Sequence, residues 1–143
     1  MSSRRIARER ALQALYQLEL SGTAPPAEAL EQAWVASTED GAPKEDDDSH
    51  QFALSLVEGV RQELVQVDAL IEKHSHNWRL DRMSRIDRNV LRLGVYELHY
   101  RAEIPKKVTL NEAVELGKKF GGEQSSAFIN GLLDKVAGAL GKE

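Results

Sequence analysis

The sequence contains no cysteine, and no apolar run in it approaches the length of a membrane-spanning helix. The first absence excludes disulfides, thiolate chemistry and thiolate metal sites, and the second excludes a transmembrane segment. The N-terminal stretch MSSRRIARER also lacks the apolar core of a secretory signal peptide. We therefore expect a cytoplasmic protein with no membrane association.

Motifs for catalysis are missing as well. Gly117-Lys118-Lys119 suggests a phosphate-binding loop, but it lacks the upstream glycine, and lysine stands where Ser or Thr would coordinate magnesium. There is no dinucleotide fingerprint, and no histidine has an evident serine or cysteine to activate. His74 and His76 are two residues apart, a spacing that does not bring both rings to one metal on a helix. We expect no enzymatic activity, no metal and no cofactor.

What the sequence does contain is the composition of one globular domain: 143 residues, 41% hydrophobic and 29% charged. The net charge of −4 is unevenly distributed. Residues 4–10 hold four arginines against one glutamate, whereas residues 39–48 hold six acidic residues against one lysine. An acidic total therefore does not exclude a polyanionic partner for the basic end.

The stretch 84–100, SRIDRNVLRLGVYELHY, predicts the central helix of the fold. Its apolar residues fall on two helical faces, which is typical of a helix buried between neighbours. Ser84 and Asp87 form a capping box at its start. Gly94 lies mid-helix, where glycine costs about 1 kcal/mol relative to alanine, so we expect another helix to cross closely there.

The remaining periodicity is helical throughout, and no segment alternates as a strand would. The sequence predicts an all-α fold of about seven helices. Thr109 and Glu112 form a second predicted capping box. Besides the central helix, the predicted helices cover residues 3–20, 26–37, 49–73, 110–120 and 123–140.

Two basic regions indicate nucleic-acid binding, and each has a plainer interpretation. Arg4, Arg5 and Arg8 form a patch at a helix N-terminus, where positive charge opposes the macrodipole; they either bind a polyanion or belong to a solvated face. Lys118 and Lys119 precede a glycine pair, a helix start with free N–H groups, and Phe128. These are ingredients of single-stranded RNA binding, but the lysines alternatively serve solubility and Phe128 the core.

Several segments together resemble the NusB family of transcription antitermination factors over essentially the whole chain. They are LRLGVYEL (91–98), IPKKVTLNEAVELGKKFGGEQSSAFINGLLDKV (104–136), NW (77–78) and the arginine-rich first helix running into ALQALYQLEL. The resemblance implies two helical subdomains, at about 1–80 and 81–143. It also implies binding of boxA RNA together with the ribosomal protein NusE. The complex would join RNA polymerase and other Nus factors to suppress termination, notably in rRNA operons.

The same resemblance implies the site residues. The RNA-binding residues carried over are Arg4, Arg5, Arg8, Arg10, Gln13, Tyr16, Lys118, Lys119, Gln124, Ser125, Phe128 and Asn130. The protein partner's face would include Trp78, Arg82 and Asp87. We further expect RNA and protein partner to use separable faces.

Three alternatives stay open at this point. One is an RNA-binding domain related to that of certain rRNA cytosine methyltransferases; because 143 residues leave no room for the methyltransferase domain, we favour the free-standing factor. Another is a helical adaptor that binds only protein. The third concerns assembly, since the sequence fits a monomer or a homodimer equally.

Overall fold

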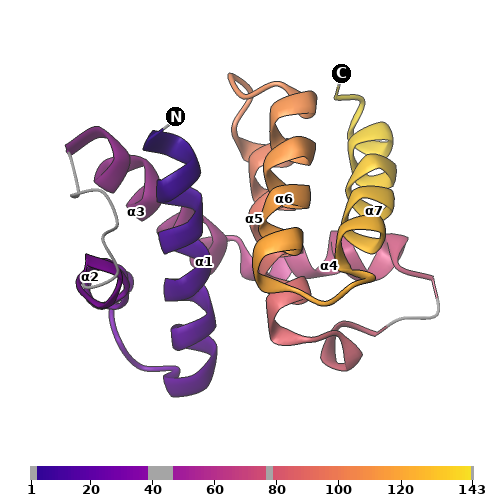
Figure 1. The fold of residues 1–143 in the computed structure, drawn as a ribbon. Helices are drawn as coiled ribbons and strands as arrows, with labels where there is room; N and C mark the ends of the chain where they lie inside the picture. Colours follow the sequence, from indigo (N-terminus) through magenta and orange to yellow (C-terminus); the bar gives the residue numbers. More distant parts are fainter. Residues whose placement is uncertain (1–2, 39–46, 77–78, 143) are drawn as a thin grey trace. The chain divides into compact units, whose positions relative to one another are not determined.

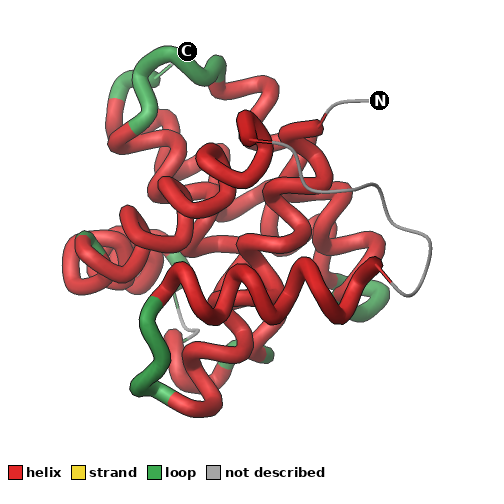
Figure 2. The backbone as a smooth tube through the Cα atoms, turned by 90° about the vertical axis from the view of Figure 1, so that its left-hand side faces the viewer, coloured by secondary structure: helices red, strands yellow, loops and turns green. Residues whose placement is uncertain are grey.

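The computed structural model describes residues 3–38, 47–76 and 79–142, and over these ranges the protein consists of helices and their connections. Figure 2 shows helices throughout and no strand in the described part of the chain. The all-α prediction is thereby confirmed. The helices, labelled in Figure 1, are α1 (Ser3–Ser21), α2 (Pro26–Thr38), α3 (Asp47–Gln62), α4 (Leu64–His74), the 3-10 helix η1 (Leu80–Arg82), α5 (Arg85–Tyr100), α6 (Lys106–Phe120) and α7 (Ser125–Leu140).

The chain divides into two compact units, residues 1–61 and 62–143. The first unit contains α1, α2 and α3, and its buried apolar residues include Leu15, Leu30, Trp34 and Leu56. Gly22 ends α1 in the left-handed conformation (φ 75°), and its N–H donates to the Leu18 carbonyl at 2.7 Å. This is a common helix stop, and glycine adopts it without steric cost.

The predicted helix over 49–73 is two helices, because the chain leaves helical geometry at Glu63. Val60 and Val67 are both fully buried, but they belong to different units. A continuous apolar stripe looks the same whether one core or two cores receive it, so the periodicity did not reveal the break.

The same break moves the boundary between the units. We expected it near residue 80, whereas the structure divides the chain between Arg61 and Gln62. The reason is α4, which packs against α5 and α7 and so belongs to the second unit. A bidentate ion pair between Arg92 of α5 and Asp68 of α4 stabilises this packing. The Nε and Nη2 of Arg92 donate to the two carboxylate oxygens of Asp68 at 2.8 and 3.0 Å.

The second unit is organised around α5, which contacts α4, α6 and α7. Both predicted apolar faces are buried along most of the helix, with Val90, Leu91, Leu93, Val95 and Leu98 at most 4% exposed, while Ile86 in the first turn is half-buried. One half of the predicted capping box is present, since the Ser84 hydroxyl accepts the N–H of Asp87 at 3.1 Å, whereas the Oδ1 of Asp87 has no hydrogen-bond partner among the described residues.

Gly94 lies at a close contact between α5 and α7. A Cβ atom built there would lie 2.6 and 2.9 Å from the two methyl carbons of Leu133. Leu133 is fully buried, so it has little room to move away. The expected close crossing at Gly94 is therefore present.

The second predicted capping box, at Thr109, is wrong. Helix α6 begins earlier, at Lys106, with Pro105 as its N-cap residue. Thr109 is instead buried inside the unit, where its hydroxyl donates to the carboxylate of Glu97 at 2.9 Å. A buried carboxylate needs such a donor, and this requirement explains the threonine.

The crossing at Gly94 predicts that Gly94→Ala lowers the free energy of unfolding by about 1–3 kcal/mol through overpacking. Gly131→Ala is the matched control, because a Cβ at this helical position meets nothing within 4 Å. It should stabilise the protein by up to about 1 kcal/mol. Urea denaturation of both variants measures the difference, and a Gly94→Ala variant as stable as the control would contradict the close crossing.

Candidate nucleic-acid interface

The arginines at the start of α1 are held by an aromatic ring. The guanidinium carbons of Arg4 and Arg8 lie 4.2 and 5.2 Å from the ring centroid of Phe52 in α3. Arg8 and Phe52 are buried, while Arg4 and Arg5 are half-buried. A cation over an aromatic face is attracted by the ring's quadrupole. The ring therefore orients two guanidinium groups that are one helical turn apart.

Arg10 is buried, as Arg8 is, whereas Arg4 and Arg5 are half-buried. Its Nη1 lies 3.7 Å from the carboxylate of Glu9 and donates to the Gln13 side chain at 3.4 Å, and its guanidinium carbon is 6.0 Å from the centre of the Trp34 ring. Burial lowers the pKa of Arg10, and the charge of Glu9 opposes that shift. Arg10 therefore helps to hold α1 in place, and Gln13 is engaged with it.

The second predicted RNA element lies where α6 ends and α7 begins. Lys118, Lys119, Gln124 and Asn130 are exposed there, with Lys118 at 3.6 Å from the carboxylate of Glu115. The structure thus brings the predicted residues of α6 and α7 into one region of the second unit. Tyr16, from the other predicted set, is half-buried on α1 in the first unit.

Ser125 has a structural task in this region. It is buried, and its hydroxyl accepts the N–H of Gly122 at 2.9 Å, which closes the turn between the two helices. A Cβ built on Gly121 would lie 2.5 Å from that hydroxyl oxygen. Glycine at this position and the serine hydroxyl together define the path of the turn.

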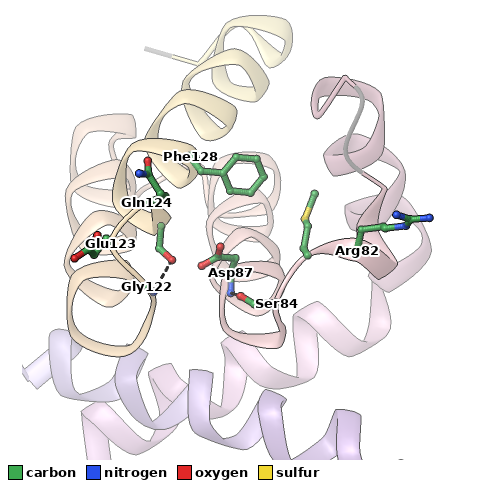
Figure 3. A pocket seen from close by; sticks show the side chains of 9 residues that line it. Arg82, Ser84, Asp87, Gly122, Glu123, Gln124 and Phe128 are labelled. Atoms are coloured by element: carbon green, nitrogen blue, oxygen red, sulfur yellow. Dashed lines mark hydrogen bonds between the residues drawn. The ribbon is translucent and has the colours of Figure 1, made fainter.

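A pocket of about 500 Å³ opens beside this turn, between the connector 79–84, the start of α5 and the start of α7. In Figure 3 the ring of Phe128 lies across the pocket from Arg82, and Asp87 lies below the ring. Gln124 and Glu123 lie on the side of the ring opposite Arg82 and point away from the ring, and Arg82 points away from Asp87. The lining residues are Arg82, Met83, Ser84, Asp87, Gly122, Glu123, Gln124, Ser125 and Phe128.

Asp87 contributes a carboxylate to the pocket lining. Its Oδ1 atom is buried and has no hydrogen-bond partner among the described residues. A buried carboxylate oxygen without a donor is costly, so a ligand that supplies an N–H group or a cation would relieve that cost. The wall formed by Phe128 and Met83 is apolar, which suits the methylene stem of a basic side chain.

The pocket unites residues that the sequence interpretation had kept apart. Arg82 and Asp87 were predicted to meet the protein partner, and Gln124, Ser125 and Phe128 to meet RNA, yet all five line one pocket. Trp78, the other predicted partner residue, lies outside the described residues.

Several residues of these surfaces were missed by the sequence interpretation. Phe52, Met83 and Glu123 were assigned no role at either site. Their positions depend on how separate helices pack, and sequence spacing carries no signal for that. Among the described residues, no group of three or more His, Asp or Glu could hold a metal ion, and no helix is long and apolar enough to cross a membrane.

The fold and its surfaces define a small all-helical protein with a cluster of arginines on one helix and an acidic pocket in its second unit. The chain belongs to the NusB family, whose model matches residues 5–138. The transcription antitermination protein NusB of Myxococcus xanthus is 66% identical over 142 residues, covering 99% of each chain. That of Anaeromyxobacter dehalogenans is 52% identical, covering 98% of this chain and 94% of the relative. None of these names describes an enzyme, which agrees with the expectation of a non-enzymatic factor.

Solved structures of the family have the same fold. NusB of T. maritima is 35% identical with a TM-score of 0.83, covering 94% of this chain and 90% of that chain. A crystal structure of antitermination factors NusB and NusE in complex with dsRNA gives 30% identity and a TM-score of 0.81, covering 97% of this chain and 98% of that chain.

The contact between Arg4 and Phe52 predicts an energetic coupling between the two side chains. A double-mutant cycle with Arg4→Met and Phe52→Leu, followed by urea denaturation, should give a coupling of about 0.5–1 kcal/mol. Arg61→Met with Phe52→Leu is the control, because Arg61 lies nine residues along α3 from the ring and should show no coupling. Equal coupling in both cycles would mean that the guanidinium does not interact with the ring.

Proposed function

We propose that this protein acts in the cytoplasm as a transcription antitermination factor that binds boxA RNA together with the ribosomal protein NusE. The pair would join RNA polymerase and other Nus factors, notably on rRNA operons. Membership of the NusB family supports antitermination. The similar solved complex of NusB, NusE and dsRNA supports both ligands. The observation that carries RNA binding by this chain is the pair of arginines oriented by Phe52.

In this proposal Arg4 and Arg5 contact phosphates, because a guanidinium offers paired N–H donors that match phosphate oxygens. Arg8, which was predicted to do the same, is buried against Phe52 and would support that surface from within. Tyr16 and Gln13 continue that surface along α1, and Arg10 supports it from within. The second RNA element consists of exposed cations and amides around the start of α7, with Ser125 holding the turn between them. The residues of that element are Lys118, Lys119, Gln124, Ser125, Phe128 and Asn130.

NusE would occupy the pocket with a basic side chain. The unpartnered Oδ1 of Asp87 supports this proposal, since it lacks the donor that such a side chain would bring. Asp87 is the charged group beside the Phe128 ring, while Glu123 points away from the ring and Arg82 points away from Asp87 (Figure 3), so the pocket favours a cation over a phosphate. Arg82 would contact NusE at the pocket's edge. Trp78, which lies outside the described residues, is also proposed as a NusE contact.

The two ligands are then separable only in part. The arginines of α1 belong to the first unit and Asp87 to the second, so each can be changed alone. Phe128 and Gln124 share the pocket with Asp87, and substitutions there should affect both ligands. A boxA gel shift with and without NusE tests the function. An adaptor that binds only protein would bind NusE and show no specific, salt-dependent RNA binding.

Arg5→Ala should weaken boxA binding and leave NusE binding nearly unchanged. The slope of log K against log salt should flatten by up to about 0.7, the value for one single-strand phosphate contact. Arg61→Ala, which removes an exposed arginine in the last turn of α3, is the matched control. A steeper or unchanged slope with Arg5→Ala would exclude Arg5 from the phosphate contacts.

Asp87→Asn should have the opposite effect. It keeps the shape of the side chain but removes its charge, so NusE binding should weaken by about 1–3 kcal/mol while boxA binding by the isolated chain barely changes. Asp81→Asn is the control, since Asp81 is an exposed acid on the adjacent connector and does not line the pocket. Calorimetry of both variants with NusE decides the point; equal losses would mean that the pocket acid is not the contact.

A further inference from the structure

The pocket wall opposite Phe128 is built on a segment with little structure of its own. The connector 79–84 contains one 3-10 helix of three residues, and the residues on either side, Arg79 and Met83, are extended (ψ 149° and 151°). Its internal hydrogen bonds are those of Arg82 N–H to the Arg79 carbonyl and Met83 N–H to the Leu80 carbonyl, at 3.0 and 3.2 Å. So short a 3-10 turn has poor hydrogen-bond geometry and depends on its surroundings for stability.

Arg88 supplies that support from the first turn of α5. Its Nη1 donates to the Leu80 carbonyl at 3.0 Å and to the Met83 carbonyl at 2.9 Å, so one nitrogen bonds both ends of the 3-10 turn. Hydrogen bonds from a charged donor are about twice as strong as neutral ones, and the half-buried position of Arg88 protects them from water.

We propose that Arg88 is a positioning residue for the protein partner. It does not line the pocket, but it holds the connector that carries Arg82 and Met83 at a set distance from Asp87. Asp87 and Arg88 are consecutive residues of α5, so the acid and the brace share one helical turn. A wall fixed before binding lowers the conformational cost of association. This inference rests on the proposed role of the pocket in binding NusE.

The geometry also explains why the side chain is an arginine. The two N–H bonds of one Nη atom diverge within the guanidinium plane and reach two carbonyls in different directions. A lysine ammonium is carried on a shorter and more flexible stem, and it would hold the turn less rigidly.

The first test compares Arg88→Gln and Arg88→Lys with Arg85→Gln, an exposed arginine in the same turn of α5. Calorimetry with NusE should show about a tenfold loss of affinity for Arg88→Gln, a smaller loss for Arg88→Lys and nearly none for the control. Hydrogen exchange at the Arg82 and Met83 amides should accelerate in Arg88→Gln while exchange in the middle of α5 stays slow. Unchanged NusE affinity in a folded Arg88→Gln variant would overturn the inference.

A second test separates positioning from a general loss of stability. In a Met83→Ala background the wall side chain is already gone, so adding Arg88→Gln should cost less NusE affinity than it does in the wild type. The same fold loss in both backgrounds would overturn the positioning role. The proposed function fails in a different way, namely if the wild-type chain does not bind NusE at all. A third outcome would reject the role of Arg88 and leave the proposed function intact. In that case the wild type binds NusE and Asp87→Asn lowers the affinity, but Arg88→Gln does not.

Discussion

The close contact of α5 with α7 at Gly94 is the constraint on which the second unit depends. The Leu133 side chain occupies the space where any other residue at position 94 would place a Cβ atom, so α7 packs directly on the backbone of α5 there. α5 also contacts α4 and α6, so it is held from several directions. The first turn of α5, which Ser84 caps, contains Asp87 of the pocket and Arg88, whose side chain bonds the connector 79–84. The candidate site is consequently built on two packed helices, with Asp87 on α5 and Phe128 on α7, and the connector 79–84 and the turn before α7 complete its walls.

Several buried or half-buried polar side chains of this unit have hydrogen-bond partners on neighbouring segments. Arg92 and Asp68 satisfy each other across α5 and α4, and Glu97 receives the hydroxyl of Thr109 across α5 and α6. Lys142 donates to two carbonyls at the end of α5, and burial there lowers its pKa. Each of these groups makes a contact that ties neighbouring segments together. The buried Oδ1 of Asp87 differs from these groups, because it has no hydrogen-bond partner among the described residues.

The sequence predicted those features that depend on local periodicity and failed where distant segments meet. The two apolar faces of α5, the Ser84 cap and the crossing at Gly94 follow from residue spacing within one helix, and the structure contains them, although Asp87 does not complete the capping box through its Oδ1. The break at Glu63 was missed because one stripe of apolar residues serves two cores. Thr109 was misread because a capping box and a buried hydroxyl donor look identical in sequence. The pocket joins residues about forty positions apart, and only the packing of α5 against α7 brings them together.

The same packing decides how two ligands of opposite charge can share a small protein. Arginines oriented by Phe52 in the first unit suit a polyanion, and the acidic pocket at the start of α5 repels one. Lys118 and Lys119 stand in the last turn of α6, and the turn that follows them borders the pocket. The Phe128 ring at that border carries no charge, so the ring itself loses little favourable hydration when either ligand covers it. RNA and a basic protein bound on either side of this ring would also attract each other, so each should strengthen the binding of the other.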